Sequence, residues 1–152
     1  MKSELKSYSV REIVDGFVYD EFEGKGLFGL DGKLTIQPEY QRNYVYAEKK
    51  KDAPVIHSLL LGYPLGLLYF NKLDDGSLEV LDGQQRITSF GRYVTGWFAV
   101  KQGGLETYFT GLPKEKQEKI LDTEILVYEC EGTEEEIKDW FRTINTAGVP
   151  LN

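Results

Sequence analysis

Residues 77–94 have the sequence SLEVLDGQQRITSFGRYV, and a change of hydrophobic period within this stretch decides the fold of the domain. The segment 77–81 is typical of a strand, and it runs directly into an Asp-Gly dipeptide. After the glycine, apolar residues recur at i, i+3 and i+7, which predicts a helix from about Gln84 to Val94 with one buried face formed by Ile87, Phe90 and Val94. The unit is therefore a strand, a glycine turn and a helix.

The start of this helix is a candidate anion site. Backbone N–H groups in the first turn of a helix have no intrahelical partner, so they favour a ligand such as phosphate. Gly83 lets a ligand approach the backbone, and Arg86 adds a guanidinium with bidentate hydrogen-bonding geometry. Asp82 repels a bare phosphate. Its presence therefore suggests that it binds a Mg²⁺ ion that accompanies a nucleotide, orients a water molecule or accepts a hydrogen bond from a ribose hydroxyl.

The same residues have a purely structural interpretation. Asp82 is then an N-cap, Gly83 a tight-turn residue and Arg86 a surface ion-pair partner. Short motifs often match by chance, so the spacing alone favours this structural interpretation.

The rest of the chain mixes helices and hairpins. Ser9 is expected to cap a short helix ending at Val14, which begins the domain, and a hairpin around Asp31-Gly32 spans residues 27–36. We also expect a helix at 48–61, a strand at 66–73 antiparallel to that at 77–81, a helix at 113–121 and a strand at 123–128. A capping box of Thr133 and Glu136 opens a last helix, whose apolar face consists of Ile137, Trp140, Phe141 and Ile144.

This element order favours an α+β fold over a regular parallel sheet. No repeat or linker divides the chain, so we expect a single domain spanning residues 1–152. Trp97 and Trp140 continue apolar faces and are expected in the core.

The charge and cysteine content of the chain restrict the classes of function that it can have. Eighteen basic and 25 acidic residues give a net charge of −7, which disfavours general electrostatic binding of nucleic acid. A local basic patch remains open, because Lys49, Lys50 and Lys51 adjoin Arg42 in the sequence. One cysteine, Cys130, and a start without the features of a secretory signal indicate a cytoplasmic protein.

Two further segments carry polar and aromatic residues of interest. Residues 36–46, IQPEYQRNYVY, place Arg42 in an aromatic-rich stretch after a predicted strand. Tyr40 is expected to pack in the core, whereas Tyr44 and Tyr46 remain candidates for stacking on a base. Residues 141–151, FRTINTAGVPL, end a helix at Asn145, which either binds a ligand or caps the helix.

In this order, the three segments resemble the N-terminal domain of the GmrS/GmrD-like (GmrSD) modification-dependent restriction proteins. The resemblance covers most of the chain and rests on Tyr-Gln-Arg at 40–42, Asp-Gly-Gln-Gln-Arg at 82–86 and Asn-Thr-x-Gly-x-Pro-Leu at 145–151. The second motif is highly specific, and the other two are moderately so. The resemblance implies a ParB/sulfiredoxin-like fold, a small mixed sheet with flanking helices, in which this turn holds nucleotide phosphates.

The resemblance also implies site residues and partners. Asp82 would be the catalytic or Mg²⁺-binding residue, and the nucleotide triphosphate would be bound by Arg42, Gly83, Gln84, Gln85, Arg86 and Asn145. NTP binding, with or without hydrolysis, would permit cleavage of modified DNA by a His-Asn-His nuclease domain. This nuclease domain would either follow at the C-terminus of the same polypeptide or belong to a separate protein. This chain is expected to lack nuclease activity alone, because its one histidine, His57, cannot build that metal site.

Three departures from the family pattern matter. Tyr46 stands where tryptophan is frequent, and it keeps an aromatic face. Cys130 follows a different predicted strand from the phosphate turn, so sulfiredoxin-type reduction is not expected and Cys130 is interpreted as a small buried residue. The chain stops at the end of a family motif, which suggests either an excised N-terminal domain or a naturally short relative.

A second hypothesis comes from a different functional class. A ParB-like module could recognise modified DNA without any nucleotide, although the acidic composition counts against it.

Overall fold

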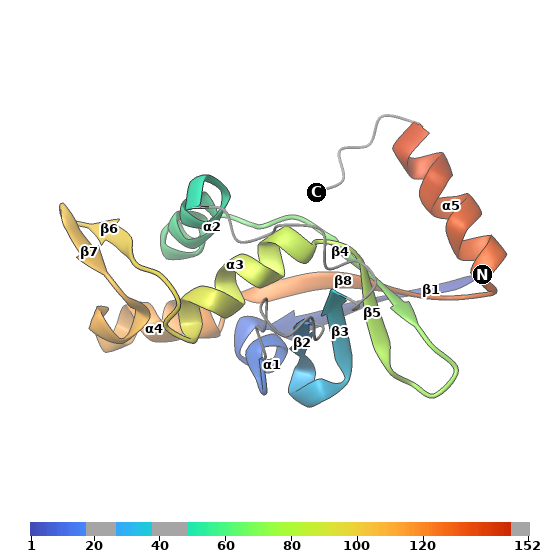
Figure 1. Cartoon of the computed structure of the whole chain (residues 1–152), viewed down its shortest axis with the longest axis horizontal. Coiled ribbons are helices and arrows are strands. Elements are labelled where there is room, and N and C mark those ends of the chain that lie inside the picture. The colour runs from blue at the N-terminus through green and yellow to red at the C-terminus, as the bar shows by residue number, and fades with distance from the viewer. Residues whose placement is uncertain (18–26, 38–48, 147–152) are drawn as a thin grey trace.

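The computed structural model describes residues 1–17, 27–37 and 49–146 (Figure 1). Within them, a six-stranded sheet has the order β1-β8-β4-β5-β3-β2. Its strands are β1 (Lys2–Ser9), β2 (Leu27–Gly29), β3 (Leu34–Gln37), β4 (Leu68–Lys72), β5 (Leu78–Asp82) and β8 (Glu124–Glu131). The β4/β8 and β3/β5 pairs are parallel and the other three pairs antiparallel. The prediction of an α+β fold with a small mixed sheet is therefore confirmed.

Helices flank this sheet (Figure 1). They are α1 (Val10–Val14), α2 (Lys49–Leu61), α3 (Gln84–Val94), α4 (Lys114–Leu121) and α5 (Glu134–Thr146), with short 3₁₀ turns at Leu30–Gly32 and Phe109–Gly111. The strands β6 (Val100–Gln102) and β7 (Leu105–Thr107) form a separate hairpin that projects away from the main sheet in Figure 1. No helix in the described ranges is long and apolar enough to span a bilayer.

The core holds α3 in place. Ile87, Phe90 and Tyr93 on its inner face have no exposed surface, and they belong to the same buried cluster as Leu68 and Phe70 of β4. Each large apolar side chain buried in this way contributes roughly 1.5–3 kcal/mol. The start of α3 is therefore fixed at the end of β5.

The predicted caps at Ser9 and at Thr133 are confirmed at atomic detail. Ser9 Oγ accepts from the Glu12 N–H at 3.0 Å, and Glu12 Oε1 accepts from the Ser9 N–H at 2.9 Å, which completes a capping box at α1. Thr133 and Glu136 make the same reciprocal pair at α5, at 3.1 and 2.9 Å.

Three expectations need correction. The domain begins with strand β1, not with the helix at Ser9. The hairpin of residues 27–36 turns through a 3₁₀ segment in which Leu30 and Asp31 have φ of 50° and 53°, in place of a simple two-residue turn. Trp97 and Trp140 were both expected in the core, but Trp97 is 49% exposed, and Trp140 is half-buried outside the core cluster, where it packs on Tyr69 at a centroid distance of 5.4 Å.

Helix α5 is tied to the start of β1 by a charge pair with a pH dependence. The N-terminal ammonium of Met1 donates to Glu136 Oε2 at 2.8 Å, and this contact, aided by the Thr133 N–H, lowers the pKa of Glu136 to about 2 from 4.5. Because the pKa is depressed in the folded state, the stabilisation is present above pH 4.5 and is lost as the pH falls through about 2.

We expect an NMR titration of the Glu136 carboxyl carbon to give a midpoint near 2, and N-terminal acetylation to move it toward 4.5. A midpoint unaffected by acetylation would contradict the pairing with the N-terminus.

Candidate functional site

Gly83 makes the turn between β5 and α3. It is the N-cap of α3, with φ of 112° and ψ of 8°, a left-handed conformation that residues with a side chain rarely adopt. A Cβ at this position would lie 2.4 Å from Leu68 Cδ2. Conformation and space therefore both require glycine, and α3 starts without a side-chain cap.

Asp82 and Arg86 form a buried ion pair across this turn. Arg86 Nη2 lies 3.2 Å from Asp82 Oδ2, and the two side chains are 10% and 3% exposed. Arg86 Nη1 also donates to the Leu65 carbonyl at 2.7 Å, and a Cβ on Gly66 would lie 3.0 Å from Nη1. The guanidinium thus joins the segment before β4 to the first turn of α3.

The environment of Arg86 sets its electrostatics. Burial lowers the pKa of its guanidinium from the ordinary value, and the charge of Asp82 opposes that shift. Burial and the charge of Asp82 together raise the pKa of Tyr69, which pairs with Asp82 in the sheet. The structural interpretation of this turn was wrong on two points, because Asp82 is not the cap of α3 and Arg86 is not a surface residue.

The two glutamines of the motif differ in their partners. Gln84 Nε2 donates to the Val80 carbonyl at 3.1 Å, which fastens the turn to β5. Gln85 Nε2 donates to Ser89 Oγ at 3.0 Å and makes a longer contact of 3.4 Å with Asp52 Oδ1. Gln84 holds the turn in place, while Gln85 connects it to α2.

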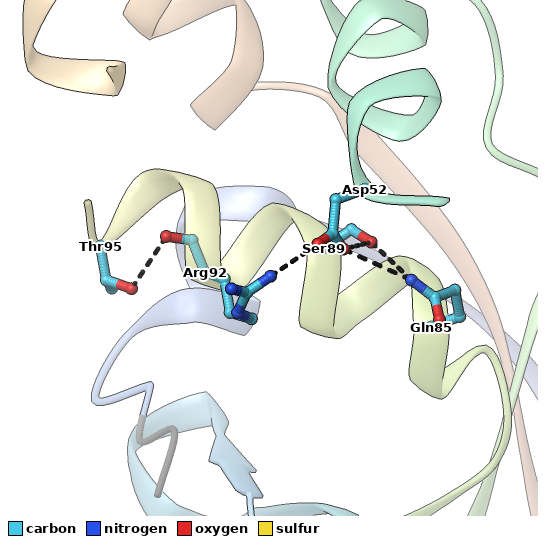
Figure 2. Close-up of polar contacts among 5 residues, drawn as sticks. All are labelled: Asp52, Gln85, Ser89, Arg92 and Thr95. Atoms are coloured by element: carbon cyan, nitrogen blue, oxygen red, sulfur yellow. Dashed lines mark hydrogen bonds and ion pairs between the residues drawn. The ribbon is translucent and has the colours of Figure 1, made fainter. Parts of the chain in front are cut away.

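A buried carboxylate network joins α2 to α3 (Figure 2). Asp52, 2% exposed, accepts from Ser89 Oγ at 2.7 Å through Oδ1 and from Arg92 Nη1 at 2.6 Å through Oδ2. Figure 2 shows Gln85, Ser89 and Arg92 along one side of α3, and Thr95 Oγ1 in contact with the Arg92 carbonyl at 3.4 Å at the end of the helix. Thr95 Oγ1 also makes a shorter bond, of 2.7 Å, to the Gly91 carbonyl. Sequence reasoning missed this network, although polar residues at i, i+4 and i+7 on α3 were a signal for it.

The structure therefore brings together five of the predicted site residues, Asp82, Gly83, Gln84, Gln85 and Arg86. Arg42, Tyr44 and Tyr46 lie outside the described residues, as does the side chain of Asn145. Cys130 is buried on β8 as expected, and burial raises the pKa of its thiol. His57 Nε2 lies 3.3 Å from the Lys101 carbonyl, on the surface between α2 and β6.

A cleft of about 530 Å³ adjoins the turn at Gln84. It lies between the β4–β5 hairpin and α5, and its volume falls in the range of small-molecule sites, roughly 300–1,000 Å³. Its charged lining is mixed, with Lys72 and Lys138 beside Asp74, Glu79 and Glu134. Among the described residues, no group of three or more His, Cys, Asp or Glu side chains is placed to hold a metal ion.

Comparison with known proteins identifies the family. No curated protein and no solved structure shows a significant match, so the likeness to ParB and sulfiredoxin rests on sequence motifs alone. Residues 25–152, which include the whole strand–turn–helix unit, match the domain described as "GmrSD restriction endonuclease, N-terminal domain". The chain thus belongs to the family of GmrSD N-terminal domains, which are components of restriction systems.

Proposed function

We propose that this chain is a nucleotide-binding regulatory domain of a restriction system, and that the turn Asp82–Arg86 holds the phosphates. The observation that carries the proposal is the geometry of Gly83, a left-handed N-cap at which a side chain would be strained and which leaves the first turn of α3 without a side-chain cap. Such helix starts favour anionic oxygens.

The buried ion pair supports this role. Asp82 was the one residue of the motif that opposes a phosphate, and its charge is balanced by Arg86 at 3.2 Å. Because both side chains are buried and Arg86 is also bonded to the Leu65 carbonyl, the turn is rigid before any ligand arrives. A preorganised site loses less conformational entropy on binding.

The cleft at Gln84 gives the rest of the nucleotide a place to lie. It opens beside the turn and has enough volume for a base and ribose. Lys72 and Lys138 are the cationic side chains of this lining, which also carries Asp74, Glu79 and Glu134.

Mg²⁺ enters this proposal as a companion of the phosphates. The described residues offer it no cage of protein ligands, and on this turn Asp82 is the one carboxylate. Mg²⁺ usually binds one or two carboxylates together with substrate phosphates and water, so a single carboxylate fits this mode. Bound Mg²⁺ would neutralise phosphate charge, while Asp82 would orient it or a water molecule.

We further propose that nucleotide occupancy of this turn controls DNA cleavage by a nuclease partner. The family name places the domain in an endonuclease, and a His-Asn-His nuclease domain with modified DNA as its target is the partner that the sequence resemblance implies.

Isothermal titration calorimetry of each NTP with Mg²⁺ tests the proposal. We expect one site on the wild-type domain and at least about a tenfold loss of affinity in Arg86→Ala, since the variant leaves the Asp82 carboxylate beside the phosphates without its counter-ion and removes the bond from Arg86 to the Leu65 carbonyl. Arg86→Lys, which retains the charge and disturbs the fold less, should show an intermediate loss.

Arg11→Ala is the matched control, because it removes one arginine from an exposed pair with Asp122. Absence of binding to the wild type, or equal binding by folded Arg86→Ala, would refute the proposal. A mobility-shift assay without nucleotide separates the alternative, since a DNA-recognition module would bind modified duplex tightly in that condition.

A further inference from the structure

A second hollow lies at the other end of α3 from the proposed phosphate turn. It has a volume of about 480 Å³ and is lined by Asp52, Arg92, Trp97, Phe98, Ala99, Glu106 and Tyr108. Helix α3 has 11 residues, so at ~1.5 Å per residue its two ends are about 15 Å apart. None of the lining residues belongs to the 82–86 motif, and the hollow is a separate site.

Aromatic side chains form much of its wall. Trp97 and Tyr108 are 49% and 52% exposed, and both flank the projecting β6–β7 hairpin. Large aromatic side chains left exposed around a concave surface are typical of a binding site. Phe98 is partly buried, and the Arg92 guanidinium lies 5.1 Å from the centre of its ring. An aromatic ring of this wall thus already contacts a cation.

The charges of the lining favour a positively charged ligand. Arg92 and Asp52 neutralise each other at 2.6 Å and are both shielded from solvent. Among the lining residues that the structure describes, Glu106 carries the remaining charge, and it is exposed. Aromatic faces together with a carboxylate are the combination that recognises ammonium and guanidinium groups.

We propose that this hollow binds an organic cation, an alkylammonium or guanidinium group, between the aromatic side chains of Trp97 and Tyr108 and the carboxylate of Glu106. The phosphates of a nucleotide would be repelled by Glu106, so the ligand differs from that of the Asp82–Arg86 turn. The cation comes either from a free amine or from a lysine or arginine side chain of a polypeptide.

Trp97 provides the experimental signal. The described residues contain two tryptophans, and Trp140→Phe leaves Trp97 as the reporter. In that background, titration with N-acetylarginine amide should produce a saturable change in fluorescence, and the neutral N-acetylcitrulline amide should not. A glycine- and serine-rich peptide with one arginine, and spermidine, represent the two sources of the cation, and saturable binding of either supports the site.

Variants locate the binding. Glu106→Gln should weaken cation binding about two- to fivefold, which is the effect of one exposed charge. Tyr108→Ala should weaken it at least about twofold, because an aromatic face that contacts the cation is lost. Glu4→Gln on the exposed face of β1 removes the same charge elsewhere and should leave the affinity unchanged.

Circular dichroism confirms that each variant is folded before its titration. The proposal is overturned if the citrulline compound binds equally well, if Glu4→Gln weakens binding as much as Glu106→Gln, or if no cation gives saturation. Calorimetry with NTP remains independent of this result, because the two sites share no residue.

Discussion

Replacing Gly83 with alanine is expected to lower the free energy of unfolding by about 2–6 kcal/mol. A left-handed backbone costs a residue with a side chain roughly 1–3 kcal/mol, and an overpacked contact costs a further 1–3 kcal/mol. The contact in question is the approach of the new Cβ to Leu68 Cδ2, at 2.4 Å. Folded Gly83→Ala should also lose NTP binding, because the turn cannot keep its geometry.

Urea denaturation at low temperature measures the first effect, with Gly76→Ala as the matched control. Gly76 has φ of 86° in the β4–β5 turn, and a Cβ added there would have no atom within 4 Å, so alanine carries the backbone cost without the clash. Equal losses for the two variants would show that Leu68 does not restrict position 83.

Replacing Asp52 with alanine is expected to destabilise the protein by about 3–5 kcal/mol, the usual cost of removing one partner from a buried ion pair. The substitution removes the carboxylate from Arg92, and it also removes the acceptor of Ser89 Oγ. Contacts between α2 and α3 should loosen as a result.

Asp122→Ala is the control for this experiment. Asp122 pairs with Arg11 at 3.1 Å on the surface, where such pairs contribute at most about 1 kcal/mol. The double variant Asp52→Ala/Arg92→Met should recover part of the stability, because it removes the buried charge as well. A loss below about 1 kcal/mol in Asp52→Ala would show that the network does not stabilise the fold.

The strand–turn–helix unit was predictable because its signals are local. The hydrophobic period changes within a few residues of Gly83, and the capping boxes at Ser9 and Thr133 are contained in four residues each. In these segments the local backbone preference and the pattern of buried apolar residues favour the same secondary structure, so the sequence pattern predicts the observed element.

Features that depend on distant residues were missed. Asp52 lies 37 and 40 positions from Ser89 and Arg92, and nothing within α2 alone indicates that its carboxylate is buried. Trp97 follows Gly96, whose φ of 88° turns the chain after α3, so the helical periodicity no longer applies to its side chain. The spacing of Asp82 and Arg86, at i and i+4, indicates that they can pair. The burial of this ion pair, however, depends on the segment around Leu65, which no local pattern reveals.

Strand β1 was missed for a related reason, since its exposed residues give little alternation. Its position has a consequence for biosynthesis. Within the described sheet its neighbour is β8, and Tyr8 bonds to Glu129, 121 positions later in the chain. At about 5–20 residues per second, the ribosome needs roughly 6–24 s to make that partner. The nascent segment therefore waits unpaired, and its charged Lys2, Glu4 and Lys6 discourage intermolecular association during that delay.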